Sequence, residues 1–212
     1  MFRGQSGAMI KVQNKLPYYL HVAVSGGVDS MAALNFLSRK HHTNILFFDH
    51  GTETSKQAYK FVAHYVGENK LGIVYGKPSY SKDKSESWEE YWRNERYRFF
   101  HSVEAPVVTA HHLDDCVETW IWSCMHGKGK IIPYSNRNVV RPFRLTRKRD
   151  LELWCNLNNV PYIEDETNKD TRYTRNFIRH EMMQNVLRVN PGIHKTVMKK
   201  VKADEYTTRA AL

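Results

Sequence analysis

The sequence predicts an α/β protein with a doubly wound, Rossmann-like parallel sheet. Three observations lead to this prediction: short apolar runs alternate with amphipathic segments, the runs are rich in β-branched and aromatic residues, and several are followed by glycine or histidine. Strands that alternate with helices form parallel sheets with helices on both faces. A length of 212 residues fits one main domain.

The expected elements follow one another along the chain. Strands are expected at residues 19–24, 44–48, 71–75 and 106–110, and helices at 31–37, 55–69, 88–103, 148–158 and 172–187. Asp29 or Ser30 is expected to supply the acceptor at the start of the first helix. The glycine-rich, basic segment from Gly127 to Arg149 is expected to be a mobile loop. The domain is placed at residues 18–190, after a flexible leader at 1–17 and before a helical extension or tail at 191–212.

Charge and cysteine content narrow the class of protein. The chain has 32 Lys and Arg against 22 Asp and Glu, a formal net charge of +10, which favours a polyanionic partner such as nucleic acid. A basic surface that serves solubility alone is the alternative. The three cysteines form no Cys-x-x-Cys pair, so no zinc, iron-sulfur or organic prosthetic group is expected. Because no run of about 18 apolar residues occurs, we expect a cytoplasmic protein without a membrane partner.

The hexapeptide Ser25 to Ser30, Ser-Gly-Gly-Val-Asp-Ser, carries the sharpest functional signal. Two glycines let the backbone approach an anion, and the start of the next helix adds favourable partial charge. The segment has neither the lysine of a Walker loop nor the glycine spacing of a dinucleotide fingerprint. It therefore predicts a different kind of phosphate site, although a glycine pair can also serve only to make a tight corner.

A second cluster of polar residues follows the fourth expected strand. If a helix opens at His111, then His111, Asp115 and Glu118 share one face, with Asp114 at its margin. Carboxylates grouped without a basic neighbour in sequence repel one another and imply a cation, either a metal ion or the ammonium of a substrate. The alternative is that they only complement the helix dipole. Ligands of parallel sheets bind at the carboxyl ends of strands, where Ser25, His50 and His111 are expected.

The hexapeptide resembles the loop of the N-type ATP pyrophosphatases, which cleave ATP between its α and β phosphates. This resemblance implies an adenine nucleotide alpha hydrolase-like fold. It also implies that Asp29 helps to hold Mg²⁺ and that ATP is bound by Ser25, Gly26, Gly27, Val28, Asp29 and Ser30.

The stretch His111 to Thr119 is similar to the His-His-x-Asp-Asp-x-x-Glu-Thr motif of the tRNA(Ile)-lysidine synthases. Four further segments resemble the same family in the same order: Arg93 to Tyr97, Arg141 to Phe143, Glu164 to Asn168 and Arg175 to Arg179. Together they cover residues 22–191. Two departures are Cys116, where the family often has glutamine, and Thr52-Glu53, where it tends to have Leu-Arg after His-Gly.

This second resemblance implies ligation of lysine to carbon-2 of the wobble cytidine of a tRNA(Ile) with a CAU anticodon. An adenylated base would be the intermediate, and AMP and pyrophosphate would be released. Asp29, Asp115 and Glu118 are the implied catalytic residues, and the last two also bind lysine. Further ATP contacts are expected from His50, Arg93, His111 and Arg175.

Contacts with the anticodon region of tRNA are expected from Lys128, Lys130, Arg137, Arg141, Arg144 and Arg179, and also from Lys148. Trp122 or Tyr134 is a candidate for stacking on a base, and Trp120 is more simply a core residue. A homodimer is a further expectation, because many relatives have additional tRNA-binding domains. Two alternatives remain open: another tRNA-modifying enzyme of the superfamily, such as one that thiolates a base, and an amide-forming ATP pyrophosphatase that acts on small molecules.

Overall fold

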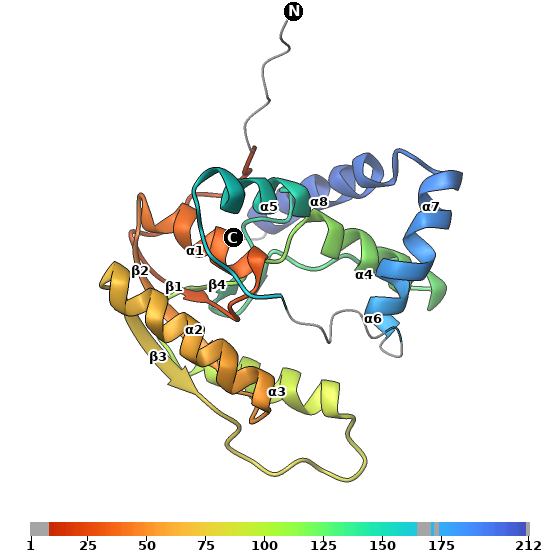
Figure 1. Ribbon diagram of the computed structural model, residues 1–212. Helices are drawn as coiled ribbons and strands as arrows, with labels where there is room; N and C mark the ends of the chain where they lie inside the picture. Colours follow the sequence, from red (N-terminus) through yellow and green to blue (C-terminus); the bar gives the residue numbers. More distant parts are fainter. Residues whose placement is uncertain (1–8, 165–170, 172–173, 211–212) are drawn as a thin grey trace, which may run out of the picture.

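The computed structural model of the protein describes residues 9–164, 171 and 174–210 (Figure 1). In this part of the chain six strands form one sheet, in the order β3-β2-β1-β4-β6-β5. The strands are β1 (Tyr19–Ala23), β2 (His42–Phe48), β3 (Gly72–Gly76), β4 (Val107–Val108), β5 (Ser135–Asn136) and β6 (Val139–Val140). Neighbouring strands are parallel except for β5 and β6. The predicted α/β fold is confirmed.

The helices begin and end close to the expected positions. They are α1 (Val28–Ser38), α2 (Glu53–Asn69), α3 (Trp88–His101), α4 (Leu113–Met125), α5 (Lys148–Leu157), α6 (Thr174–Phe177), the π-helix η2 (Ile178–Met182), α7 (Met183–Val189) and α8 (Ile193–Ala210). The expected loop at 127–149 instead contains β5 and β6, which are too short to give a strand pattern. None of the described helices is long and apolar enough to cross a membrane.

Alternate residues of the strands pack on opposite faces of the sheet. Val22 and Ile45 belong to the main core with residues of α1, α2 and α5, whereas Leu46 and Val107 pack with Phe100 of α3. The helices therefore cover both faces, as Figure 1 shows. Each fully buried Val, Leu or Ile contributes roughly 1.5–3 kcal/mol to folding.

A second apolar cluster joins α4, η2 and α8 beside the sheet. Its buried members include Val117 of α4, Ile178 of η2, and Val197 and Val201 of α8. The carboxyl-terminal helix α8 thus packs directly on α4, the helix that follows β4. The helical extension expected at the end of the chain is attached to the element that carries the acidic motif.

The strand order creates a crevice between β1 and β4. Val22 of β1 pairs with Ile45 of β2 on one side and with Val108 of β4 on the other. The chain continues outward from this pair in opposite directions, which is the topological switch point where open parallel sheets bind ligands. The hexapeptide follows β1 and the acidic motif follows β4, so both lie at this crevice.

The end of the expected flexible leader is held against the body of the protein. Lys11 N donates to Thr146 Oγ1 at 2.9 Å, and Thr146 Oγ1 donates to Lys11 O at 2.9 Å. Gln13 is buried, and its backbone N donates to Pro142 O at 2.8 Å. The expectation of a loose segment is therefore wrong for Lys11 and Gln13.

Two arginines expected to contact tRNA are buried instead. Arg144 is 0% exposed and donates to Gln13 Oε1, Ile132 O and Asp204 Oδ2 at 3.1, 2.7 and 2.8 Å. Arg141 is 3% exposed and donates to Pro133 O at 2.9 Å and Tyr97 Oη at 2.8 Å. Their guanidinium groups join separate segments of the chain, Arg144 through carbonyl and carboxylate acceptors and Arg141 through a carbonyl and a hydroxyl acceptor. The expectation that Arg141 and Arg144 face tRNA is therefore wrong.

Replacing Arg144 with methionine should lower the free energy of unfolding by about 2–4 kcal/mol, since the buried acceptors would lose their donor. The measurement is urea unfolding followed by circular dichroism. Arg149→Met is the control, because Arg149 is exposed on α5 and should change stability by less than about 0.5 kcal/mol. Equal midpoints for the two variants would contradict the structural role of Arg144.

Candidate active site

The loop between β1 and α1 is closed by bonds within and around the hexapeptide. Gly26 has a φ of 86°, and a Cβ at this position would lie 3.1 Å from Ile163 Cδ1. Gly26 O accepts a hydrogen bond from Ile163 N at 3.0 Å. Ser30 Oγ donates to Gly27 O at 2.9 Å, and Ser25 N donates to Ser30 Oγ at 3.2 Å. These contacts fix the backbone around the first turn of α1.

The first turn of α1 has no side-chain cap among the described residues. Gly27 is the N-cap, whereas α2, α3 and α4 are capped by Thr52, Ser87 and His112. The expectation that Asp29 or Ser30 supplies the cap is wrong, because both residues lie inside the helix. Backbone N–H groups at such a terminus favour an anion.

Asp29 lies in this first turn and reaches toward the crevice. Its Oδ2 is 3.5 Å from His112 Nε2, and its Oδ1 is buried without a hydrogen-bond partner in the described part of the chain. Mg²⁺ is commonly held by one or two carboxylates together with substrate phosphates, so Asp29 fits as a ligand. No group of three potential metal ligands occurs among the described residues, so phosphate oxygens would have to complete the coordination.

The acidic motif opens α4, but the helix begins at Leu113 rather than at His111. His112 is the N-cap and forms a capping box with Asp115: Asp115 N donates to His112 Nδ1 at 3.2 Å, and His112 N donates to Asp115 Oδ2 at 2.9 Å. His111 therefore precedes the helix and does not share its face. The sequence interpretation missed His112, although the His-x-x-Asp spacing carries the signal of this cap.

His112 connects the hexapeptide to the acidic motif. Burial lowers the pKa of its imidazole, but the charges of Asp115, Asp29 and Asp114 more than offset this and raise the pKa above its usual value. His112 is 1% exposed. Any movement of this ring would change the positions of Asp29 and Asp115 together.

Asp115 and Glu118 form a buried carboxylate pair, 6% and 4% exposed. Arg175 Nη2 lies 2.6 Å from Asp115 Oδ1, and Arg175 Nε lies 3.1 Å from Glu118 Oε2. Arg179 Nε lies 2.7 Å from Glu118 Oε1, and its Nη2 lies 3.3 Å from Asp115 Oδ1. Two carboxylates and two guanidinium groups thus form one cluster, which we call the acid–arginine cluster.

The cation expected beside these carboxylates is a metal ion or a substrate ammonium, whereas in the structure they pair with Arg175 and Arg179 of the chain itself. Both arginines come from α6 and η2, far along the chain, and lie four positions apart. The π-helical turn that contains Arg179 is a distortion often found at functional sites. Burial raises the pKa of Asp115, but His112 and Arg175 more than reverse this, so the pKa is lowered and the group is ionised. Arg179, expected on tRNA, contacts these carboxylates instead.

Asp114 has a structural role beside the pair. Its Oδ1 is 3.0 Å from His194 Nε2, and its Oδ2 accepts from Lys148 N at 2.8 Å and from Arg147 Nε at 3.3 Å. Burial raises the pKa of Asp114, but the bonds to His194 and Lys148 outweigh it and lower the pKa. Asp114 therefore joins the starts of α4, α5 and α8.

The two other histidines expected at the site lie at the carboxyl ends of strands. His111 Nδ1 is 2.9 Å from Thr109 Oγ1, and burial lowers the pKa of His111 to about 3, so the ring is neutral. His50 follows β2; its backbone N donates to Ser55 Oγ at 3.1 Å, and its ring packs against Trp92. Both positions lie at the carboxyl-terminal edge of the sheet, His111 after β4 and His50 after β2.

Arg93 and Arg96 lie on α3 in different environments. Arg93 is exposed, and its guanidinium lies 5.4 Å from the ring centroid of Tyr97. Arg96 is half-buried; burial lowers its pKa, and the positive charges of Arg93 and Arg175 lower it further. No acidic partner of Arg96 is found among the described residues. Arg96 is thus a further candidate for binding an anionic ligand. It was not among the site residues expected from the sequence, although it belongs to the Arg-x-x-Arg-Tyr segment.

The remaining expected RNA contacts divide by exposure. Lys128, Lys130 and Arg137 are exposed, and Lys148 is half-buried. Trp120 packs against the α4 and α8 cluster, as preferred from the sequence, whereas Trp122 is 41% exposed. Tyr134 lies under the guanidinium of Arg144. The expected Glu164 to Asn168 segment falls largely outside the described residues.

Three comparisons place this geometry among known proteins. A tRNA(Ile)-lysidine synthase of Thermosipho africanus is 34% identical over 199 residues, which are 85% of this chain and 47% of that protein. The enzyme of the same name from Thermotoga maritima is 31% identical over 198 residues, 85% of this chain and 48% of its own. The chain spans about half the length of the curated relatives it matches. The U34-tRNA thiolase NcsA of Methanococcus maripaludis, described with its [4Fe-4S] cluster, shares the fold with a TM-score of 0.71 and 12% identity, covering 92% of this chain and 73% of that one.

A family model described as the PP-loop domain matches residues 7–186. This match includes the hexapeptide loop, the acidic motif and both arginines of the acid–arginine cluster. The chain therefore belongs to the PP-loop domain family.

Proposed function

We propose that the chain ligates lysine to carbon-2 of the wobble cytidine of a tRNA(Ile) with a CAU anticodon, using ATP and releasing AMP and pyrophosphate. One observation carries the proposal: the uncapped start of α1 is joined through His112 to the buried pair Asp115 and Glu118. In this proposal the phosphate site and the amine site lie on either side of His112. The named relatives support this combination of substrates.

In the first step, the carbonyl oxygen at carbon-2 of the cytidine attacks the α-phosphorus of ATP. The bond from this phosphorus to the bridging oxygen of the β-phosphate breaks, and pyrophosphate leaves. The amides of the first turn of α1 and the hydroxyl of Ser25 bind the departing phosphates, where negative charge develops. His50, His111 and Arg93 border the bound nucleotide, and Mg²⁺, held by Asp29, would neutralise phosphate charge.

In the second step, the side-chain nitrogen of lysine attacks carbon-2, and the bond from carbon-2 to the oxygen of AMP breaks. The attacking amine must lose a proton, and Asp115 or Glu118 accepts it. The acid–arginine cluster is balanced in formal charge, so an ammonium group binds there only if a guanidinium moves. Arg175 is the group we expect to move, since its side chain is 44% exposed against 24% for Arg179. Arg175 would then meet the phosphate of AMP, as expected of an ATP-binding residue.

RNA is proposed to contact the exposed cations Lys128, Lys130 and Arg137. The excess of positive charge, +10 over the whole sequence, supports a polyanionic partner. Phosphate contacts of this kind release counterions from the RNA, so the affinity should fall steeply with salt.

The direct test is incorporation of labelled lysine into a tRNA with a CAU anticodon in the presence of ATP and Mg²⁺. Replacing Asp115 with asparagine or Glu118 with glutamine should reduce incorporation by about 100-fold or more, because the proton acceptor and the amine site are both impaired. Glu53→Gln is the control, since Glu53 is an exposed residue of α2. Unchanged turnover in both site variants would remove the pair from the mechanism. If the tRNA instead acquires label from a sulfur donor and none from lysine, the result would point to base thiolation.

A second prediction concerns Asp29. Replacing it with asparagine should raise the Mg²⁺ concentration that gives half-maximal AMP formation, because a neutral amide is a weaker ligand for a hard cation. The measurement is a titration of AMP formation with Mg²⁺ at constant ATP and tRNA. Thermal unfolding serves as the control for folding of the variant. An identical Mg²⁺ dependence in the two proteins would count against Asp29 as a ligand.

A further inference from the structure

We propose that a polar pocket at the amino-terminal edge of the sheet binds phosphate groups of the RNA backbone. The proposal rests on the proposed function, which supplies the RNA. The pocket, with a volume of about 530 Å³, lies between the last turns of α3 and the β5–β6 connection. It is lined by Asn94, Tyr97, Arg98, His101, Ser102, Asn136 and Arg137.

The pocket is separate from the candidate active site. α3 leads into β4, and Asn138 precedes β6; because these two strands are parallel, their amino ends share one edge of the sheet. The hexapeptide and the acidic motif follow the opposite ends of β1 and β4. The start of α3 does reach the active edge, since Trp92 packs against His50. Helix α3 therefore connects the two edges.

The chemistry of the pocket favours an anion. Its lining includes Arg98, His101 and Arg137 and contains no carboxylate. Arg98 also contacts the buried carboxylate of Glu95, whose Oε2 accepts from Ser79 N at 2.5 Å. A guanidinium has five N–H donors, so the contact with Glu95 leaves Arg98 further donors for a phosphate.

The hydrogen bonds of Asn138 fix the proton of His101. Asn138 Nδ2 donates to Phe100 O at 2.9 Å and to Val103 O at 2.8 Å, so Asn138 Oδ1 must be an acceptor. His101 Nδ1, at 2.7 Å from Asn138 Oδ1, is therefore the donor. The other ring nitrogen of His101, Nε2, is left for a ligand.

The openness of the pocket favours a polymer over a small nucleotide. Five of the seven lining residues are exposed, whereas sites for small ligands enclose most of the ligand surface. The α3 residues from Arg93 to His101 span about 12 Å at roughly 1.5 Å per residue. A backbone that enters the active edge near Arg93 can follow α3 to the pocket and place successive phosphates beside Arg98 and Arg137.

The test compares tRNA affinity of Arg137→Asn and Arg98→Gln with that of the unmodified chain over a range of salt concentrations. Asparagine suits position 137, where φ is 52°, and this variant leaves the contacts of Glu95 intact. Each variant should weaken binding about 3- to 10-fold at 0.1 M salt. Each should also reduce the slope of log affinity against log salt by about 0.7–0.9, the contribution of one phosphate contact.

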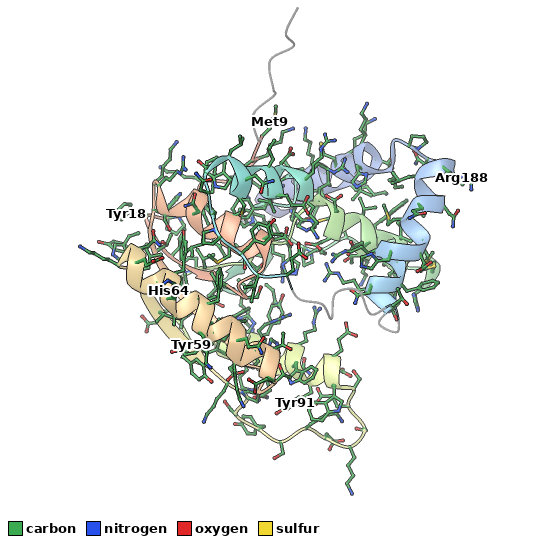
Figure 2. The ribbon with its side chains drawn as sticks, viewed as in Figure 1. Met9, Tyr18, Tyr59, His64, Tyr91 and Arg188 are labelled. Carbon is green, nitrogen blue, oxygen red and sulfur yellow. The ribbon has the colours of Figure 1, made fainter. Side chains whose placement is uncertain are left out.

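Arg188→Gln is the matched control. Arg188 is exposed at the far end of α7, distant from Tyr91 and the rest of α3 (Figure 2). The affinity of the Arg188→Gln variant for tRNA should change by less than about 2-fold, and the slope of log affinity against log salt should be unchanged. Thermal unfolding of all three variants confirms that they are folded.

Unchanged slopes in folded Arg137→Asn and Arg98→Gln would overturn the proposal. In a second experiment the unmodified chain and both variants are titrated with inorganic phosphate and with AMP. If the variants lose binding of either ligand but keep the salt slope for tRNA, the pocket binds a small anion and the RNA assignment is overturned. Formation of AMP by the unmodified chain is measured in parallel. If the variants have reduced slopes but the unmodified chain forms no AMP, the pocket is supported and the proposed function is contradicted. If the chain forms AMP but the slopes of the variants are unchanged, only the proposal for the pocket is contradicted.

Discussion

The start of α1, where backbone N–H groups face the crevice without a side-chain cap, is the constraint on which the rest of the site depends. Gly26 adopts a left-handed φ and packs against Ile163, so that the chain can turn from β1 into this helix. The strand order then places the start of α4 across the crevice, and His112 links the two helix starts through Asp29 and Asp115. The start of α1 and the pair Asp115 and Glu118 are thereby connected through His112.

The acid–arginine cluster explains how Asp115 and Glu118 can both be buried, because each carboxylate pairs with a guanidinium group. Without Arg175 and Arg179 the two buried carboxylates would lose their ion-pair partners while shielded from water, which is strongly destabilising. The same pairing blocks an incoming ammonium, so the proposed function requires the cluster to open. In the proposed function Arg175 moves and Arg179 stays on Glu118, with which it pairs in the structure.

The fold was predictable where the sequence has long or regular signals. The parallel sheet is predicted by the apolar runs of β1 and β2 and by the helical patterns of α2 and α3. Strands that are covered by helices on both faces need such continuous apolar runs. β5 and β6 have two residues each and leave no pattern. The motif residues predict where the crevice lies. The ion pairs between residues far apart in the sequence cannot be predicted from the spacing of residues within a motif. The sequence therefore predicts neither the burial of Arg144 nor the arginine partners of Asp115 and Glu118, since tertiary contacts alone decide which arginines are buried.

The account is tested most directly by the products of ATP cleavage. The chain is incubated with tRNA, Mg²⁺, lysine and ATP labelled separately in the α- and γ-phosphates, and the products are separated. Departure of two linked phosphates from the first turn of α1 predicts AMP and pyrophosphate in equal amounts. ADP and orthophosphate as the products would contradict the assignment of this turn as a pyrophosphate site.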